Sequence, residues 1–489
     1  MKNNIRGHIL LWGGWLFPLL LYAQNIVTLN EAINVWALRC NEARATNLRY
    51  HNERLKYANY KKSLFPSLTF QLAPVNLNHS LRQLQDAVKG DYRYVDDYAN
   101  NSNAGFILQQ IIRQTGGTLT ASSNITYLRE FSRNRNSFST NVFTLGYTQS
   151  FRGDRRRFRL NDAVQRTTNL LSVRNYCTEM SAVQRHVLSL YLEALLYKLE
   201  QDLAQRSLSI EDTLLQVAAT KHKEGYITTY DYNQVELQQL NTRFIYEEAN
   251  QNYHSACRRL SDYLGLNNTI SVTEPTDSLP FMVDYELFLQ QVQRNNPTML
   301  AQKLQLQQAE ATWHEADLET RFNGSISLNY GLNQYAECLT DAYKHPINSQ
   351  SISISFRIPV FQWGINRNKR RIAENQREET ILKIDSDRRT FESSLYDQVY
   401  SYNSSVSMAC IARRTYLLAC NQYSLLVHKF GLGSVSVYEL ISARKEQQTT
   451  LKQYYESLRQ QYETYYALRH LSLYDFINQE DLADRFLIN

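Results

Sequence analysis

The sequence predicts a mainly α-helical fold with additional β-strands, built from two copies of one helix–hairpin–helix plan. The 489 residues include only 16 Gly and 8 Pro, so few tight turns interrupt the chain. Residues 155–224 contain neither residue type, which indicates one very long helix. A pattern of glycine, hydroxyl and acid occurs twice, as "HKEGYITTYDYNQV" at 222–235 and "FGLGSVSVYELISA" at 430–443. Each copy interrupts a long helical pattern, so we interpret the pair as an internal duplication.

Residues 1–23 have the layout of a secretory signal peptide. Lys2 and Arg6 give a basic start, an apolar stretch covers 9–22, and the small residue Ala23 marks the expected cleavage site. The alternative is a single membrane anchor, but the apolar stretch is short and is interrupted by glycine and proline. The sequence therefore predicts an exported protein.

Apolar residues recur at helical spacing in six segments, namely 29–63, 155–222, 229–264, 285–320, 367–429 and 437–474. Gly265 is expected to cap the third of them. Within the fifth segment the apolar spacing is close to 3.5 residues, which is typical of coiled coils. Helices of this length exceed the width of a globular core, so we expect them to lie side by side.

Four segments alternate polar and apolar residues as β-strands do, namely 117–131, 137–151, 323–333 and 349–361. Ile352 and Ile354 share one face of the last segment, whereas Ser353 is on the other. This pattern fits either an outer-membrane strand or a soluble hairpin cap. Four strands cannot close a membrane barrel alone, and an open sheet edge is forbidden in lipid. The strands are therefore either soluble or part of a barrel shared by several copies.

These segments divide the chain into a first repeat at 24–266, a linker at 267–281, a second repeat at 282–476 and a tail at 477–489. Residues 64–116 allow two arrangements. If 117–131 pairs with 137–151, residues 64–116 form an insertion beneath the barrel, which is the arrangement that we favour. Alternatively, residues 67–78 are the first crossing of the membrane.

Composition excludes several classes of function. The formal net charge of +6 is small for this length, so nucleic-acid binding is not expected. The sequence lacks a nucleophile elbow, a zinc-protease motif, a P-loop and a Rossmann fingerprint, so we expect no enzyme activity and no cofactor. The six cysteines have no metal-ligand spacing, and no metal site is expected.

The signal peptide, the duplicated plan and the paired motif together resemble the TolC-type outer-membrane factor family. The family motif consists of an aromatic or basic residue, a glycine, a Ser or Thr three positions later and an acid three positions after that. The matching residues here are Gly225, Thr228 and Asp231 in the first repeat, and Phe430, Gly433, Ser436 and Glu439 in the second. The corner between strand and helix also resembles the family, at Phe361 and Gly364, with a looser counterpart at Phe151.

The resemblance implies a homotrimer in the outer membrane of a Gram-negative bacterium, in contact with outer-membrane lipid. Each protomer would give four strands to one twelve-stranded barrel, and the helices would form a long coiled-coil α-barrel in the periplasm. A periplasmic adaptor protein and an inner-membrane pump would be the partners. The chain would then be the passive exit duct of a tripartite efflux or type I secretion system.

The resemblance also implies a pore constriction near the paired motif. Glu439 and Asp231 match the acids that line the closed pore, whereas Ser442 stands where a second acid is expected. In isolation, Asp231 is equally explained as a helix-capping acid. The alternative for the whole chain is a soluble periplasmic coiled-coil scaffold or adaptor without a pore.

Overall fold

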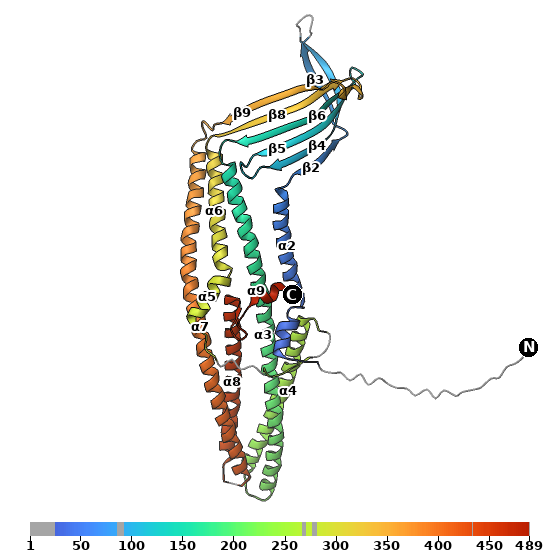
Figure 1. Ribbon diagram of the computed structural model, residues 1–489. Helices are drawn as coiled ribbons and strands as arrows, with labels where there is room; N and C mark the ends of the chain where they lie inside the picture. Colours follow the sequence, from blue (N-terminus) through green and yellow to red (C-terminus); the bar gives the residue numbers. More distant parts are fainter. Residues whose placement is uncertain (1–24, 86–91, 267–269, 276–280, 433, 489) are drawn as a thin grey trace, which may run out of the picture. The chain divides into compact units, whose positions relative to one another are not determined.

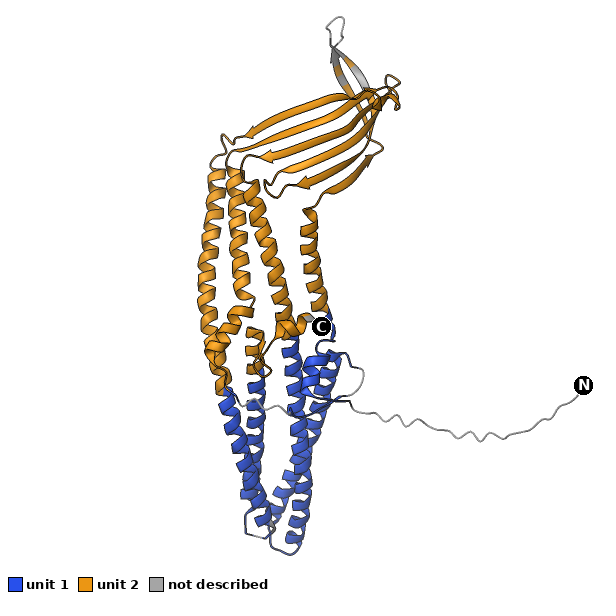
Figure 2. Ribbon diagram, in the orientation of Figure 1, with its two compact units in different colours: residues 1–44, 183–281, 405–463 blue, residues 45–182, 282–404, 464–489 orange. Residues whose placement is uncertain are grey.

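The structure is a computed structural model that describes residues 25–85, 92–266, 270–275, 281–432 and 434–488. The predicted signal peptide therefore lies outside the described residues. The chain forms two compact units, which we describe separately (Figure 2). Unit 1 contains residues 1–44, 183–281 and 405–463, and unit 2 contains residues 45–182, 282–404 and 464–489. Each unit takes residues from both repeats.

The helices agree with the predicted segments. They are α1 (Leu29–Glu31), the π-helical turn η1 (Ala32–Trp36), α2 (Asn41–Ser63), α3 (Asp154–Lys223), α4 (Thr229–Leu264), α5 (Tyr285–Asn295), α6 (Thr298–Thr320), the 3₁₀ turn η2 (Asp341–Tyr343), α7 (Ile365–Gly431), α8 (Val437–Ser472) and α9 (Leu482–Ile488). The predicted helix 285–320 divides before Pro297, because Asn296 takes the extended backbone that a following proline favours. No helix among the described residues is long and apolar enough to cross a membrane.

The two repeats have matching long helices. α3 and α7 contain 70 and 67 residues, and α4 and α8 contain 36 residues each. α4 ends at Gly265, whose left-handed backbone (φ 72°) forms the expected C-cap. The predicted duplication of the helical plan is therefore confirmed.

Part of the predicted linker forms a short strand in unit 1. β7 (Ile270–Val272) pairs in parallel with β1 (Asn25–Val27). The buried hydroxyl of Tyr191 lies 3.0 Å from the Val27 carbonyl and 2.8 Å from the Thr273 carbonyl. Residues 270–273 of the predicted linker are thus held against α3. At the other end of the chain, β10 (Tyr474–Asp475) pairs with β11 (Glu480–Asp481) in unit 2.

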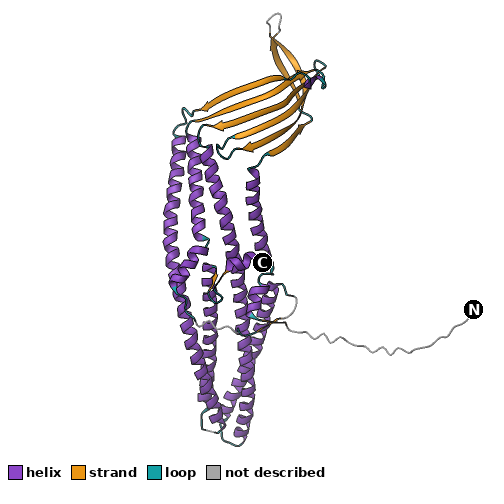
Figure 3. Ribbon diagram, viewed as in Figure 1, coloured by secondary structure: helices purple, strands orange, loops and turns teal. Residues whose placement is uncertain are grey.

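Unit 2 also contains a seven-stranded antiparallel sheet, to which all four predicted strands belong. Its strands are β2 (Ser67–Ala73), β3 (Leu77–Gln85), β4 (Tyr92–Ile111), β5 (Thr118–Glu130), β6 (Arg135–Ser150), β8 (Asn323–Ala336) and β9 (Ile347–Arg357). Six of them lie side by side in the order β2-β4-β5-β6-β8-β9, and β3 pairs with the remaining length of β4 (Figures 1 and 3).

The strand count corrects the prediction of four strands per protomer. β5 pairs with β6 as predicted, but residues 64–116 are not an insertion beneath the sheet. They supply β2, β3 and β4, and β4 pairs along the whole length of β5. The polar composition of this region hid the strands, because only β2 and one half of β4 carry regularly spaced large apolar residues.

The register places apolar residues of all six adjacent strands on one face of the sheet, because directly paired residues share a face. These residues are Leu68, Phe70 and Leu72 of β2; Ala104, Phe106 and Leu108 of β4; Leu119, Ala121 and Ile125 of β5; Phe143, Leu145 and Tyr147 of β6; Ile326, Leu328, Tyr330 and Leu332 of β8; and Ile352, Ile354 and Phe356 of β9. We call this set the apolar band. The opposite face carries mostly Ser, Thr and Asn.

The predicted corners between strand and helix occur at equivalent places in the two repeats. Gly153 (φ +93°) precedes α3, and Gly364 (φ +82°) precedes α7. Phe151 stacks on Phe356 at 5.8 Å between ring centroids, while Phe361 contacts Trp363 at 4.6 Å. The first corner also packs against α6, because a Cβ on Gly153 would lie 2.4 Å from Leu318 Cδ2.

The two corner glycines allow a matched test. Gly364→Ala is expected to cost about 1–2 kcal/mol, since the added Cβ meets open space and only the left-handed backbone is strained. Gly153→Ala is expected to cost about 1–3 kcal/mol more, because its Cβ also overlaps Leu318. Thermal unfolding followed by circular dichroism measures both. Equal losses would contradict the close packing at Gly153.

Candidate functional site

The first copy of the paired motif forms the turn between α3 and α4 in unit 1. Gly225 has a left-handed backbone (φ +76°), and no atom lies within 4 Å of the place that its Cβ would take. Thr228 then caps α4. Its hydroxyl accepts from the Asp231 backbone N–H at 3.1 Å, and the Asp231 carboxylate accepts from the Thr228 backbone N–H at 3.2 Å. This reciprocal capping box explains the spacing of three between hydroxyl and acid.

The second copy of the motif repeats this geometry between α7 and α8. The Ser436 hydroxyl accepts from the Glu439 backbone N–H at 3.2 Å. The Glu439 carboxylate accepts from the Ser436 backbone N–H at 3.0 Å and from its hydroxyl at 3.1 Å. Gly433 lies outside the described residues. Both acids therefore start a helix, as the capping interpretation of Asp231 anticipated.

The two turns lie next to each other in unit 1 (Figure 1). The Lys221 ammonium donates to the Phe430 carbonyl at 3.1 Å and lies 5.0 Å from the centroid of the Phe430 ring. The two copies of the motif are therefore neighbours in space, as far as the described residues around them show.

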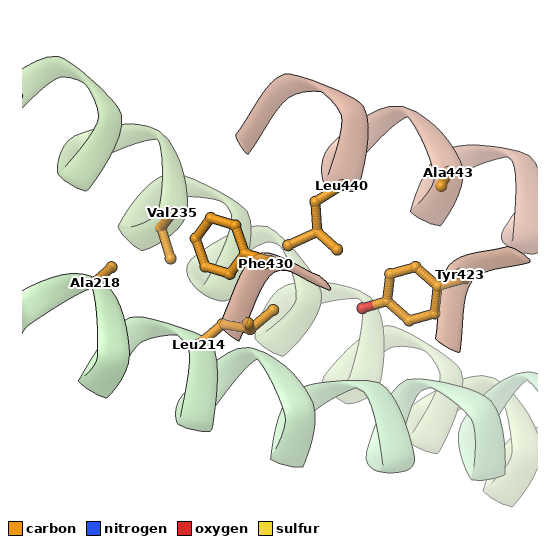
Figure 4. Packing of buried hydrophobic residues seen from close by; sticks show 7 residues of the cluster. All are labelled: Leu214, Ala218, Val235, Tyr423, Phe430, Leu440 and Ala443. Atoms are coloured by element: carbon orange, nitrogen blue, oxygen red, sulfur yellow. The ribbon is translucent and has the colours of Figure 1, made fainter. Parts of the chain in front are cut away.

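Phe430 joins the two helical hairpins through an apolar core. Its buried ring lies among side chains from both repeats (Figure 4). The buried members of this core are Leu214 and Ala218 of α3, Val235 of α4, Tyr423 and Phe430 of α7, and Leu440 and Ala443 of α8. The aromatic residue of the motif is thus a packing residue, and truncating a buried Phe costs about 3–5 kcal/mol.

A buried ion pair lies beside this core. Arg444 of α8 is 1% exposed, and its Nη1 lies 3.3 Å from Glu211 Oε1 of α3 and 3.2 Å from the Tyr423 hydroxyl of α7. Within the described chain, Arg444 Nε and Nη2 have no hydrogen-bond partner. Burial raises the pKa of Glu211, and the nearby Arg444 guanidinium opposes that rise. The ionised form of Glu211 is therefore favoured by Arg444, and the pair connects the two repeats.

Sequence reasoning located the motif residues but missed Lys221, Glu211, Tyr423 and Arg444. A signal for Arg444 was present, because it falls four residues after Leu440 and seven before Leu451, both of which are buried. A charge on an apolar stripe indicates a buried pair. Its partner Glu211 lies 233 residues earlier in the sequence, so the pairing can be identified only from the fold.

The remaining predicted residues do not join this site. Ser442 is exposed on α8, and the corner residues Phe151, Phe361 and Gly364 belong to unit 2. Among the described residues, no three His, Cys, Asp or Glu side chains gather as metal ligands would. His222 instead stacks on Tyr232, with 5.4 Å between ring centroids.

The fold is that of outer-membrane efflux channels, and comparison with known proteins agrees. Residues 288–472 match the family described as "Outer membrane efflux protein". This match agrees, for the second repeat of the chain, with the family resemblance that the sequence motifs carry. Among curated proteins, no sequence matches the chain.

Solved structures extend the likeness of fold to almost the whole chain. The CmeC outer membrane channel of Campylobacter jejuni is 12% identical with a TM-score of 0.66, covering 94% of this chain and 88% of that one. VceC of Vibrio cholerae is 11% identical with a TM-score of 0.65, covering 91% and 95%. The MtrE outer membrane channel of Neisseria gonorrhoeae is 14% identical with a TM-score of 0.61, covering 91% and 88%.

The buried pair predicts a double-mutant cycle. Glu211→Gln alone is expected to cost about 3–5 kcal/mol, because it leaves the Arg444 guanidinium buried without a counter-charge. Adding Arg444→Met to this variant should restore most of the loss. Thermal unfolding of the wild type, both single variants and the double variant gives the interaction free energy between Glu211 and Arg444. Additive losses would contradict a direct interaction.

The single variant Arg444→Met predicts a pH dependence. Without the guanidinium, nothing opposes the burial that raises the Glu211 pKa, so the folded state binds a proton more tightly than the unfolded state. Its stability deficit relative to the wild type should therefore shrink as the pH falls from about 8 to about 5. Thermal unfolding at several pH values measures this deficit. A deficit that grows toward low pH would contradict a raised pKa of Glu211 in this variant.

Proposed function

We propose that the chain is the outer-membrane exit duct of a tripartite efflux or type I secretion system, which conducts substrates passively to the exterior. The observation that carries this proposal is the apolar band. Many of its side chains are exposed, including Ile352 at 75%. A soluble protein rarely exposes an apolar face of this extent, whereas an outer-membrane strand presents such a face to lipid.

Aromatic residues flank the apolar band at both of its borders. Phe151, Phe322 and Trp363 lie at the end of the sheet where the helices begin, and all three are exposed. At the other end, Tyr98 lies 4.7 Å from Phe131, and Tyr127 lies 5.0 Å from Phe138, between ring centroids. Aromatic girdles of this kind mark the two interfaces of a membrane barrel.

The alternative of a soluble scaffold requires a cover for the apolar band. The described residues supply no such cover, since the band residues of β2 and β9 are between 55% and 75% exposed. The band therefore favours the duct. The homotrimer, the periplasmic adaptor and the inner-membrane pump are parts of the proposal that rest on the family resemblance.

Within this duct, Glu439 and Asp231 are the proposed pore-lining acids. Both carboxylates already accept hydrogen bonds that start a helix, which fixes their position at the turns. Three copies would place a ring of carboxylates around the axis and favour cations. Ser442 contributes no charge, so each copy has fewer acids here than the family pattern.

Location is the first test. The mature protein is expected in the outer-membrane fraction of a sucrose gradient, and its unheated form should migrate faster in electrophoresis than the boiled form. Recovery in the soluble periplasmic fraction would overturn the duct and favour the scaffold.

The gate is tested by Glu439→Gln, which removes the charge but retains a side chain that can complete the capping box. Single-channel currents across a salt gradient should show a reduced preference for cations. Glu247→Gln, an equal change of charge at an exposed position of α4, is the matched control and should leave the preference unchanged. Unaltered selectivity in Glu439→Gln would remove this residue from the pore axis.

A further inference from the structure

We infer that each copy of the chain contributes six strands, rather than four, to the shared barrel, and that β9 of one copy pairs with β2 of the next. This inference rests on the proposed function, because it concerns the barrel of the duct. Three copies would then close an eighteen-stranded barrel.

β4 is as firmly part of the sheet as the predicted strands are. All 13 residues of β5 pair with β4, from Ala99↔Glu130 to Ile111↔Thr118. β2 in turn pairs through all 7 of its residues, from Ser67↔Gln109 to Ala73↔Asn103. A barrel with four strands per copy would have to break these ladders, so that β5 could pair with β9 of the next copy instead of with β4.

The added strands continue the apolar band without a change of face. Phe70 of β2 is paired with Phe106 of β4, and Phe106 is paired with Ser123 of β5, next to Ala121 and Ile125 on the same face. The rings of Phe70 and Phe106 lie 4.9 Å apart. An insertion in water beneath a barrel has no reason to keep this register, whereas a lipid-facing wall requires it.

β2 and the residues that follow it extend along almost the whole part of β4 that pairs with β5. β2 has 7 residues, fewer than the roughly 9–11 that cross a membrane. The chain nevertheless continues along β4 past Pro74, since the Asn101 N–H donates to the Asn76 carbonyl at 2.9 Å and β3 follows. Residues 67–77 therefore run opposite residues 100–109 of β4, which covers almost all of the stretch that pairs with β5.

The two edges of the sheet are fit to pair with each other. β2 contains no charged residue, and β9 contains only Arg357, at its last position. Soluble proteins protect exposed edges with charges or bulges. Because the six adjacent strands alternate in direction, β2 and β9 run in opposite directions and can form an antiparallel ladder between copies. Such a head-to-tail contact closes into a ring.

This barrel would be wider than a twelve-stranded one by a factor of about 1.5, since diameter grows roughly linearly with strand number. Between the strand ends, its inner face would carry mostly Ser and Thr, as at Thr120, Ser327 and Ser353. The exit at the membrane would thus pass larger solutes with little selectivity of its own.

Disulfide cross-linking distinguishes the two barrels. The test panel joins Ser351→Cys or Ser353→Cys in β9 with Thr69→Cys or Gln71→Cys in β2. The matched panel joins the same β9 positions with Thr120→Cys or Ser122→Cys in β5, which would be the edge if only four strands per copy formed the barrel. All of these side chains lie on the face opposite the apolar band. Opposed residues of neighbouring strands are close enough for a disulfide.

Oxidation of isolated outer membranes, followed by non-reducing electrophoresis, should give covalent dimers and trimers in the β9–β2 panel. Single-cysteine variants control for the six native cysteines. Cross-links confined to the β9–β5 panel would overturn the inference and leave the proposed function intact. Cross-links in neither panel would also overturn it, provided that each variant keeps its fast-migrating unheated form. Absence of the wild type from the outer membrane would instead overturn the proposed function.

Discussion

The unpaired edges of one sheet are the constraint on which the rest of this structure depends. In lipid, a backbone N–H or C=O without a partner costs several kcal/mol, so a sheet with an apolar face must close. The edges here are β2 and β9, the two ends of the six-strand path, and they do not pair with each other within one copy. Closure by further copies therefore follows from the same register that makes one face apolar. A conduit is the consequence of that closure, since the opposite face is polar.

The pattern of a hydroxyl and an acid three residues later caps a helix at each turn, and the two turns that carry it also lie where the repeats contact each other. Thr228 with Asp231, and Ser436 with Glu439, form capping boxes that restart a helix after a break. Thr28 and Glu31 form a third, at the start of α1, so the pattern alone does not define a gate. What is specific to the paired turns is their connection through buried Phe430 and the Arg444–Glu211 pair. In the proposed duct, these contacts would hold the two hairpins together and so fix the position of the acids.

Sequence reasoning succeeded where periodicity is strong and local. α4 and the bounds of β5, β6, β8 and β9 agree closely with the prediction, because alternation and helical spacing are read directly from neighbouring residues. It failed at β3 and the first half of β4, where polar residues such as Asn100 and Asn101 obscure the alternation and pairing partners decide the structure. Arg444 and Glu211 were missed for a related reason. A buried pair between helices far apart in the sequence leaves only a charged residue at an otherwise apolar position.

Hydrogen–deuterium exchange of the wild-type protein in isolated outer membranes shows directly whether the edges of the sheet are paired. If another copy closes each edge, the backbone amides of β2 and β9 should exchange as slowly as those of β6, which has a partner strand on both sides. Rapid exchange along β2 and β9, with slow exchange in β6, would show that the sheet is open and would contradict the account.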